Sequence, residues 1–272
     1  MAEIPDSMSF TLRPIGVVQS CFKEKFGIPR QPGLAPSARA RIVLLREFSD
    51  PEAFAGLEQC SHIWVQFIFH QVHTQWQPKV RPPRLGGNKK LGVFASRSPN
   101  RPNALGLSVV ALRSIERSEQ GTCLNIAGVD LLDGTPVLDI KPYVPYADQI
   151  PTACNAIAPV APILHSVIFS AQAEDFCRSY VPPAAEAAVA PDHLQDLIRE
   201  VLQQDPRPQY QALDEQRIYG MDLLNLNVRW QYGAVGDHGC TFDDHDVACV
   251  VDHNRAENLA QCFIKVLDIM PR

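Results

Sequence analysis

The first 148 residues alternate between short apolar stretches and turn residues. The clearest stretch is His62 to Phe69, HIWVQFIF, whose aromatic and β-branched residues favour a strand. Asp50 followed by Pro51 is typical of a helix start and predicts a short helix that ends near Leu57. The other stretches predict strands over residues 10–20, 39–45, 92–95, 104–112, 122–131 and 137–143. Many short strands with one helix favour an antiparallel all-β barrel or sandwich over alternating βα units.

The pattern changes after residue 150. Residues 151–164 are rich in alanine and proline, and we place a linker there between a first domain, 1–150, and a second, 165–272. Asp192 caps a predicted helix over 193–204 that carries one apolar face: Leu194, Leu197, Ile198, Val201 and Leu202. A helix over 173–180 and strands over 165–170, 216–224, 226–231 and 262–269 complete the prediction. The mixture predicts a smaller α+β carboxy-terminal domain.

The composition is that of an ordinary globular protein, with 46% hydrophobic and 20% charged residues. No apolar run approaches the ~20 residues of a membrane span, so we expect no membrane association. The first ten residues, MAEIPDSMSF, lack the basic and apolar regions of a signal peptide. The eight cysteines are scattered without a CxxC pair. We therefore expect a cytoplasmic protein with reduced thiols.

The net charge of −5 is distributed unevenly. Residues 1–150 carry 17 basic and 13 acidic side chains, whereas residues 151–272 carry 8 and 17. The tract between Glu58 and Glu116 has no acidic residue and eight basic ones: Lys79, Arg81, Arg84, Lys89, Lys90, Arg97, Arg101 and Arg113. Such a tract favours a polyanionic partner, most commonly nucleic acid. A solvated surface balanced by acids elsewhere in the fold would have the same sequence pattern.

Residues 96–103, SRSPNRPN, form a polar loop with two arginines, Arg97 and Arg101. Proline restricts its own φ angle and the residue before it, so Pro99 and Pro102 preorganise the loop. A guanidinium held in this way binds a carboxylate or phosphate in bidentate fashion. A hairpin turn needs only about two to five residues. We therefore interpret the loop as an anion-binding loop rather than a turn with solvated charges.

The chain has neither a G-x-G-x-x-G motif after a strand nor a P-loop, which argues against classical dinucleotide binding and nucleotide hydrolysis. Four other loops are able to meet at one mouth of a barrel. They are residues 29–34, 69–71, 96–103 and 133–136.

Five motifs point to one family. PRQPGL, SHIWVQF-x-FHQ, GVFASRSPNRPN-x-LGLS, DLLDGTPVLDIKPY and QDPRPQY follow one another along the chain and closely resemble the TrmO (TsaA, YaeB-type) family. The resemblance covers residues 10–231 and the final strand. It implies a homodimeric, S-adenosylmethionine-dependent methyltransferase with a TsaA-like β-barrel catalytic domain. Its substrate would be N6-threonylcarbamoyladenosine next to the anticodon of tRNA, methylated at N6.

The resemblance also implies a cofactor pocket lined by the motif loops, close to a dimer interface. The cofactor-binding residues it implies are Gln31, Pro32, Gly33, His70, Gln71, Arg97, Leu107, Asp133, Gly134, Thr135 and Pro136. Without the family, Asp133-Gly134 would be interpreted as a plain hairpin turn. Of the two loop arginines, one suits the methionyl carboxylate and the other a tRNA phosphate or the threonyl carboxylate. The sequence leaves open which is which.

Methylation at N6 removes a proton from that nitrogen, so a general base or hydrogen-bond acceptor would help. Asp139, Lys141 and Tyr143 alternate along one strand and share a face, which makes them candidate catalytic residues if that face is the pocket rather than an interface. The implied tRNA contacts are Arg30, Lys79, Arg81, Arg84, Lys89, Lys90, Arg101, Arg207 and Tyr210. For QDPRPQY, a helix stop followed by core tyrosines fits the pattern equally well.

Residues 233–261 depart from the family pattern because they form a long insertion with six acidic residues and one arginine. The insertion also contains His238, Cys240, His245, Cys249 and His253, but their spacing matches no standard zinc pattern. Methyl transfer needs no metal, and we interpret the insertion as a solvated loop. Two other functions fit the same residues: a non-catalytic RNA-binding barrel, and a methyltransferase with a different small-molecule or RNA substrate.

Overall fold

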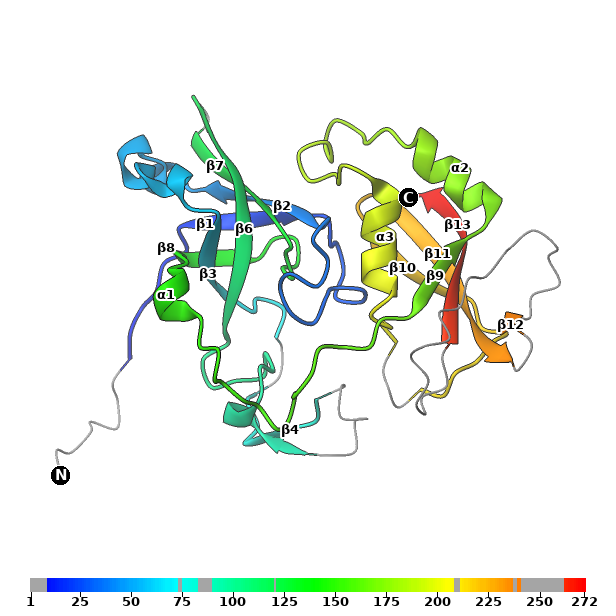
Figure 1. Ribbon diagram of the computed structural model, residues 1–272. Helices are drawn as coiled ribbons and strands as arrows, with labels where there is room; N and C mark the ends of the chain where they lie inside the picture. The colour runs from blue at the N-terminus through cyan, green and yellow to red at the C-terminus, as the bar shows by residue number, and fades with distance from the viewer. Residues whose placement is uncertain are drawn as a thin grey trace.

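The computed structural model describes residues 9–72, 75–82, 90–119, 121–207, 211–236, 239–240 and 262–272. Figure 1 shows two bodies side by side, a β-barrel from the first half of the chain and a sheet with two helices from the second half. Within these ranges, no helix has the length and apolar character to cross a bilayer.

Six strands close the barrel in the order β1-β2-β7-β6-β3-β8, and each neighbouring pair is antiparallel. This confirms the predicted antiparallel barrel. The strands are β1 (Gly16–Ser20), β2 (Arg39–Leu44), β3 (His62–Ile68), β6 (Leu105–Ser118), β7 (Gly121–Ala127) and β8 (Pro136–Pro142).

Alternating apolar residues turn one face of each strand into the barrel. In β3, Ile63, Val65 and Phe67 are buried, while Trp64 and Gln66 point outward. Strand β2 follows the same rule and buries Ala40, Ile42 and Leu44. The interior is a packed core, so a ligand site has to lie at the rim of the barrel.

The rim differs from the prediction in the segment before β6. The predicted strand over 92–95 is reduced to β5 (Leu91–Gly92), which pairs with β4 (Lys79–Val80). Val93–Ala95 forms a 3-10 turn, η5, closed by a hydrogen bond from the Ser96 backbone N to the Val93 O at 3.2 Å. The loop before β6 therefore starts from a tight turn and not from an extended strand.

The other local differences lie away from the rim. Three 3-10 turns, η1 (Arg46–Phe48), η2 (Pro51–Phe54) and η3 (Leu57–Gln59), replace the single predicted helix. Asp50 caps η2 as predicted, but Gly56 has a φ of 88° in the left-handed region, which interrupts any continuous helix. Helix α1 (Pro145–Asp148) follows β8 in a stretch where no element is predicted from the sequence.

The second half forms the predicted smaller α+β unit. Its main strands are ordered β10-β11-β13-β9, with β12 (Gly239–Cys240) beside β11. The strands are β9 (Ser166–Phe169), β10 (Tyr219–Leu223), β11 (Leu226–Gly236) and β13 (Cys262–Pro271), and the helices are α2 (Ala171–Ser179) and α3 (Leu194–Leu202). Strands β9 and β13 are parallel. Helix α3 buries the whole apolar face that the sequence predicts.

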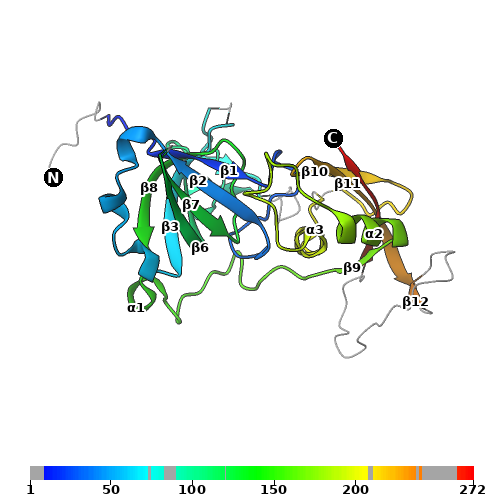
Figure 2. The same cartoon turned by 90° about the horizontal axis from the view of Figure 1, so that it is seen from above.

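The loop between β1 and β2 joins the two bodies. Phe26 in this loop stacks on Trp230 of β11, with ring centroids 5.9 Å apart. Glu200 of α3 accepts hydrogen bonds from the Ser37 backbone N at 2.7 Å and from its Oγ at 2.9 Å. Figure 1 shows α3 on the side of the carboxy-terminal unit that faces the barrel, and Figure 2 shows it against one face of the sheet. These contacts hold the loop that carries residues 29–34 at the barrel rim.

Candidate functional site

A cavity of about 890 Å³ lies at the barrel rim. Its walls come from the β1–β2 loop, the segment after β3, the loop before β6 with the start of that strand, and residues 130–135 after β7. Each of the four loops that the sequence places at one mouth contributes to the lining, but the loop 133–136 does so only through Thr135. The predicted site residues that line the cavity are Arg30, Gln31, His70, Gln71, Arg97, Arg101, Leu107 and Thr135.

One wall of the cavity is apolar. Phe67 and Phe69 meet edge to face with ring centroids 5.1 Å apart, and Trp64 and Leu131 extend the same lining. Aromatic and aliphatic walls with a few polar groups are typical of small-molecule sites. This wall suits a planar, partly apolar ligand group.

The two loop arginines have different partners. Arg97 donates from Nη1 to the side-chain oxygen of Gln31, which ties the loop before β6 to the β1–β2 loop. Arg101 donates from Nη1 to the Ser96 backbone O at 2.7 Å, and its guanidinium lies 5.9 Å from the ring centroid of Phe94. Arg101 therefore braces its own loop, whereas Arg97 connects two walls of the cavity.

The segment after β3 adds neutral and basic groups. Burial, with a smaller contribution from the positive charge of Lys25, lowers the pKa of His70 and so favours its neutral imidazole. Lys25 donates from Nζ to the Gln71 backbone O at 2.8 Å. Lys25, His70 and Gln71 all line the cavity. This part of the rim therefore presents the Lys25 ammonium group and the His70 imidazole.

Asp130 lines the cavity and is not among the site residues predicted from the sequence. It is the first residue of the motif DLLDGTPVLDIKPY, and that position was the only signal in the sequence. Its Oδ1 accepts a hydrogen bond from Ser108 Oγ on β6 at 2.7 Å. Burial raises the pKa of Asp130 to about 6, against the lowering effects of the Ser108 hydrogen bond and the charge of Arg97. A partly buried carboxyl group with a raised pKa in a cavity marks a candidate reactive group.

Five of the predicted cofactor contacts lie outside the lining: Pro32, Gly33, Asp133, Gly134 and Pro136. The Asp133 carboxylate accepts a hydrogen bond from the Ser20 backbone N at 2.7 Å and lies 3.3 Å from Lys23 Nζ. Gly33 and Gly134 have φ angles of 78° and 77°, which favour glycine whatever the space around them. These residues shape the loops, and their contact with a cofactor stays a prediction.

The three candidate catalytic residues also lie outside the lining. Asp139 and Lys141 pair in register with Gln66 and Trp64 on the outer face of the barrel, and of these four residues only Trp64 lines the cavity. Lys141 Nζ lies 2.7 Å from Asp139 Oδ2, and both side chains are about half exposed. Tyr143 follows β8, with its ring centroid 5.9 Å from that of Trp64. Their catalytic role stays a prediction, and Asp130 is the carboxyl group that the cavity contains.

The predicted tRNA contacts divide into three groups. Arg30 and Arg101 line the cavity. Lys79, Arg81 and Lys90 are exposed on and beside the β4–β5 ribbon. Arg84, Lys89 and Tyr210 lie outside the described residues, as does nearly all of the 233–261 insertion. Over the part of the chain that is described, no group of three or more His, Cys, Asp or Glu side chains is arranged to hold a metal ion.

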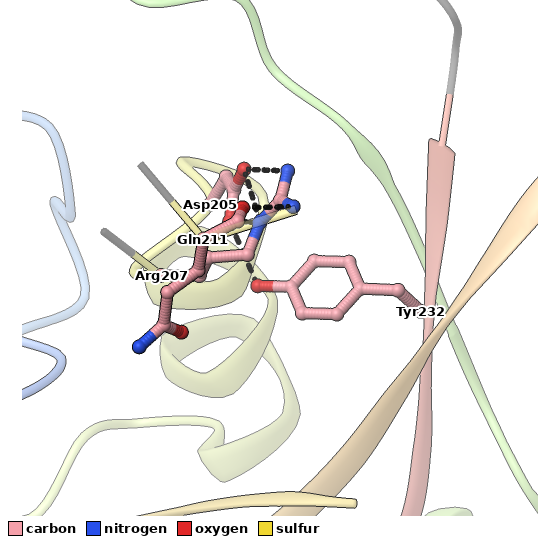
Figure 3. Close-up of polar contacts among 4 residues, drawn as sticks. All are labelled: Asp205, Arg207, Gln211 and Tyr232. Atoms are coloured by element: carbon pink, nitrogen blue, oxygen red, sulfur yellow. Dashed lines mark hydrogen bonds and ion pairs between the residues drawn. The ribbon is translucent and has the colours of Figure 1, made fainter. Parts of the chain in front are cut away.

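The remaining candidate, Arg207, forms an internal clamp with a side chain only 13% exposed. Its Nη2 donates to Asp205 Oδ2 at 2.9 Å, and its Nη1 donates to the Gln211 backbone O at 3.0 Å (Figure 3). The guanidinium lies 5.0 Å from the ring centroid of Tyr232, whose hydroxyl donates to Asp205 Oδ1 at 2.8 Å. This geometry gives Arg207 a structural role in holding the chain after α3, and its tRNA contact stays a prediction.

The fold and the cavity define a class: a closed antiparallel barrel with a ligand-sized cavity at its rim, fused to an α+β unit. Residues 17–149 match the model of the tRNA-methyltransferase O N-terminal domain, and residues 162–244 match that of the TrmO C-terminal domain. The chain belongs to the tRNA-methyltransferase O family, which confirms the resemblance drawn from the five motifs.

Individual relatives agree with the family models. The chain is 48% identical to a putative S-adenosylmethionine-dependent methyltransferase, RcsF, of Pseudomonas aeruginosa, over 83% of this chain and 94% of that protein. It is 42% identical to the tRNA (adenine(37)-N6)-methyltransferase of Escherichia coli K12, over 84% and 95% of the two chains. The crystal structure of TrmO from Pseudomonas aeruginosa matches 97% of this chain and 99% of its own, with a TM-score of 0.70 and 38% identity.

The internal clamp predicts the effect of Arg207→Ala. The substitution would leave the Asp205 carboxylate, itself 14% exposed, without its countercharge. We expect the free energy of unfolding to fall by about 3–5 kcal/mol, measured by urea denaturation. The control Tyr232→Phe removes one hydroxyl and should cost about 1 kcal/mol. An Arg207→Ala variant as stable as the parent protein would contradict the clamp.

The buried carboxyl group predicts a pH-dependent effect of Asp130→Asn. The pKa of Asp130 is about 6 in the folded protein against an ordinary value of 3.8, so between these values the folded state holds a proton that the unfolded chain releases. The stability contributed by Asp130 is therefore lost as pH rises from about 4 to about 6, by on the order of 3 kcal/mol.

Asp130→Asn should accordingly raise the melting temperature at pH 8 and change it little at pH 4. Differential scanning calorimetry at both pH values checks this. The control Asp175→Asn removes an exposed carboxylate on α2 and should show no such difference. Equal effects of Asp130→Asn at the two pH values would show that its carboxyl group has an ordinary pKa.

Proposed function

We propose that this protein is an S-adenosylmethionine-dependent methyltransferase that methylates N6 of the N6-threonylcarbamoyladenosine next to the anticodon of tRNA, in the cytoplasm. The observation that carries the proposal is one rim cavity that unites Arg97, an aromatic wall and the partly buried carboxyl group of Asp130. The family supports it, since similar proteins of Escherichia coli and Eikenella corrodens are named tRNA (adenine(37)-N6)-methyltransferases.

The cavity has the chemistry to hold the cofactor. S-adenosylmethionine supplies an electrophilic methyl group on a sulfonium, and it also carries a carboxylate and an adenine. Arg97 is assigned the carboxylate, because it connects two cavity walls and a guanidinium binds carboxylates in bidentate fashion. Phe67 and Phe69 offer faces for the adenine. A volume of about 890 Å³ lies within the usual range of roughly 300–1,000 Å³ for small-molecule sites.

The surroundings of the cavity suit RNA. Lys79, Arg81 and Lys90 are exposed along the basic tract, and Arg30 and Arg101 bring positive charge to the rim itself. Basic side chains that neutralise phosphates supply much of the affinity of a protein for nucleic acid. The tRNA backbone is therefore assigned to this tract, with the anticodon loop directed toward the cavity.

A second copy of the chain is assigned to the apolar surface next to the cavity. Phe94, Leu105 and Leu107 are 77%, 44% and 51% exposed, and Leu105 and Leu107 also line the cavity. Phe94 is linked to the cavity through Arg101, which lines the cavity and whose guanidinium lies 5.9 Å from the Phe94 ring centroid. Exposed apolar side chains around one site mark an interaction surface. A homodimer would cover them and narrow the opening of the cavity.

Sedimentation velocity tests the homodimer. We expect the parent protein to sediment as a dimer and Phe94→Glu to sediment largely as a monomer, because a carboxylate would be buried without a partner. Val181→Glu provides the control, since Val181 is 81% exposed in the carboxy-terminal unit and should leave the dimer intact. A monomeric parent protein would contradict this part of the proposal.

Mass spectrometry of tRNA nucleosides tests the reaction. Purified protein, S-adenosylmethionine and tRNA that carries N6-threonylcarbamoyladenosine should yield a nucleoside heavier by one methyl group, absent when the cofactor is omitted. Binding of tRNA without any methylated product would identify a non-catalytic RNA-binding barrel. Cofactor binding without methylation of this nucleoside would indicate a different substrate.

Arg97→Ala should weaken S-adenosylmethionine binding by at least about tenfold, because a charge-assisted hydrogen-bond pair is lost. Isothermal titration calorimetry gives the dissociation constant. The matched control is Arg178→Ala on α2, whose guanidinium is 67% exposed and far from the cavity in the fold. Unchanged cofactor affinity in Arg97→Ala would remove the assigned role of Arg97.

A further inference from the structure

Asp130 lines the cavity. Among the described residues, no cationic side chain is in contact with its carboxyl group. Ser108 Oγ donates a hydrogen bond to Oδ1, and the backbone N–H of Asp130 also stabilises the ionised carboxylate. The neighbouring carboxylates are engaged differently: Asp133 binds the Ser20 backbone N and Lys23, and Asp139 pairs with Lys141 outside the barrel. A carboxylate that lines the cavity and contacts no cation is an available proton acceptor.

The proposed reaction needs such an acceptor. The nitrogen that is methylated carries one hydrogen and is attached to a carbamoyl group, which withdraws electrons. This attachment makes the nitrogen a poor nucleophile and its N–H more acidic than that of a simple amine. Removing the proton as the new bond forms therefore accelerates the transfer.

We propose that Asp130 is the catalytic base that takes the N6 proton of the tRNA nucleoside, and that Ser108 is the positioning residue that orients its carboxylate. The inference rests on the function proposed above. The N6–carbon bond forms while the bond from that carbon to sulfur breaks, and sulfur keeps the electron pair. The N6 proton passes to Asp130 Oδ2, so charge and atoms balance.

The charges around Asp130 suit this task. A base works best when its pKa lies close to the working pH, and burial brings the pKa of Asp130 to about 6. Arg97 is near enough to favour the ionised form, and Ser108 stabilises it through its hydrogen bond. The other charged or titratable side chains of the cavity are Lys25, Arg30, His70 and Arg101. His70 has a lowered pKa, so a pH profile has to separate its titration from that of Asp130.

The test is the single-turnover rate of methyl transfer to tRNA from pH 5 to pH 8.5. For the parent protein we expect the rate to fall tenfold per pH unit below pH 6, as Asp130 becomes protonated. Asp130→Asn keeps an acceptor for Ser108 but cannot take a proton. Its rate should fall about 10²- to 10⁴-fold and lose the pH dependence below pH 6.

Calorimetry with S-adenosylmethionine and filter binding of tRNA provide readouts that do not depend on turnover. Both dissociation constants of Asp130→Asn should stay within threefold of the parent values. A cofactor affinity reduced more than tenfold would assign Asp130 to cofactor binding and overturn the inference. A transfer rate within threefold of the parent rate would overturn it as well.

Ser108→Ala separates a base from a merely structural carboxyl group, and it decides the question if Asp130→Asn fails to fold. The lost hydrogen bond lowers the pKa of Asp130 in the parent protein, so its removal should move the acidic limb of the rate profile to higher pH. In the His70→Asn variant, the pH of the acidic limb should not change. A limb unmoved in Ser108→Ala would contradict the role of Asp130.

A parent protein that binds cofactor and tRNA but transfers no methyl group would instead overturn the proposed function, and the inference with it.

Discussion

Closure of the barrel by β1 is the constraint on which the site depends. Strand β1 pairs with β2 along its whole length but meets β8 at only two positions, Gly16 opposite Val137 and Val17 opposite Pro136. A Cβ at Gly16 would lie 2.6 Å from the Val43 backbone O, so glycine is what permits the close approach of β1 to β2. Because β1 closes the ring, segments far apart in sequence end at one rim. The cavity therefore exists only in the closed barrel.

The β1–β2 loop then couples the cavity to the carboxy-terminal unit. Lys23 Nζ lies 3.3 Å from Asp133 in the turn before β8 and 3.5 Å from Glu186 in the segment between α2 and α3. Phe26 stacks on Trp230, and Gln31 in the same loop accepts the hydrogen bond from Arg97. The carboxy-terminal unit thus supports the loop that carries one cavity wall. Loss of packing in that unit would therefore disturb the cavity as well as the sheet.

Asp130 shows how stability and reactivity oppose each other at this rim. Its carboxyl group is partly buried with a hydroxyl partner, whereas Asp133 and Asp139 have ammonium partners at the surface of the fold. A buried carboxylate without a contacting cation disfavours the folded state near neutral pH. The same environment gives the group a basicity suited to accepting a proton. A locally unfavourable charge of this kind is characteristic of functional sites, and natural proteins retain it where activity requires it.

The sequence by itself determined the barrel, the α+β unit, the family and most of the loops around the cavity, because alternation, caps and motifs are encoded among neighbouring residues. Tertiary structure decided which side chains face the cavity. An irregularity between Gln66 and Phe67 shifts the pairing of β3 with β8 and sets Asp139 on the outer face, which strand alternation alone could not show. Asp130 depends on Ser108 from another strand, and Arg207 is enclosed by Tyr232 from the carboxy-terminal sheet. Burial and charge pairing arise from contacts between distant segments, so they follow from the closed fold and not from the local pattern.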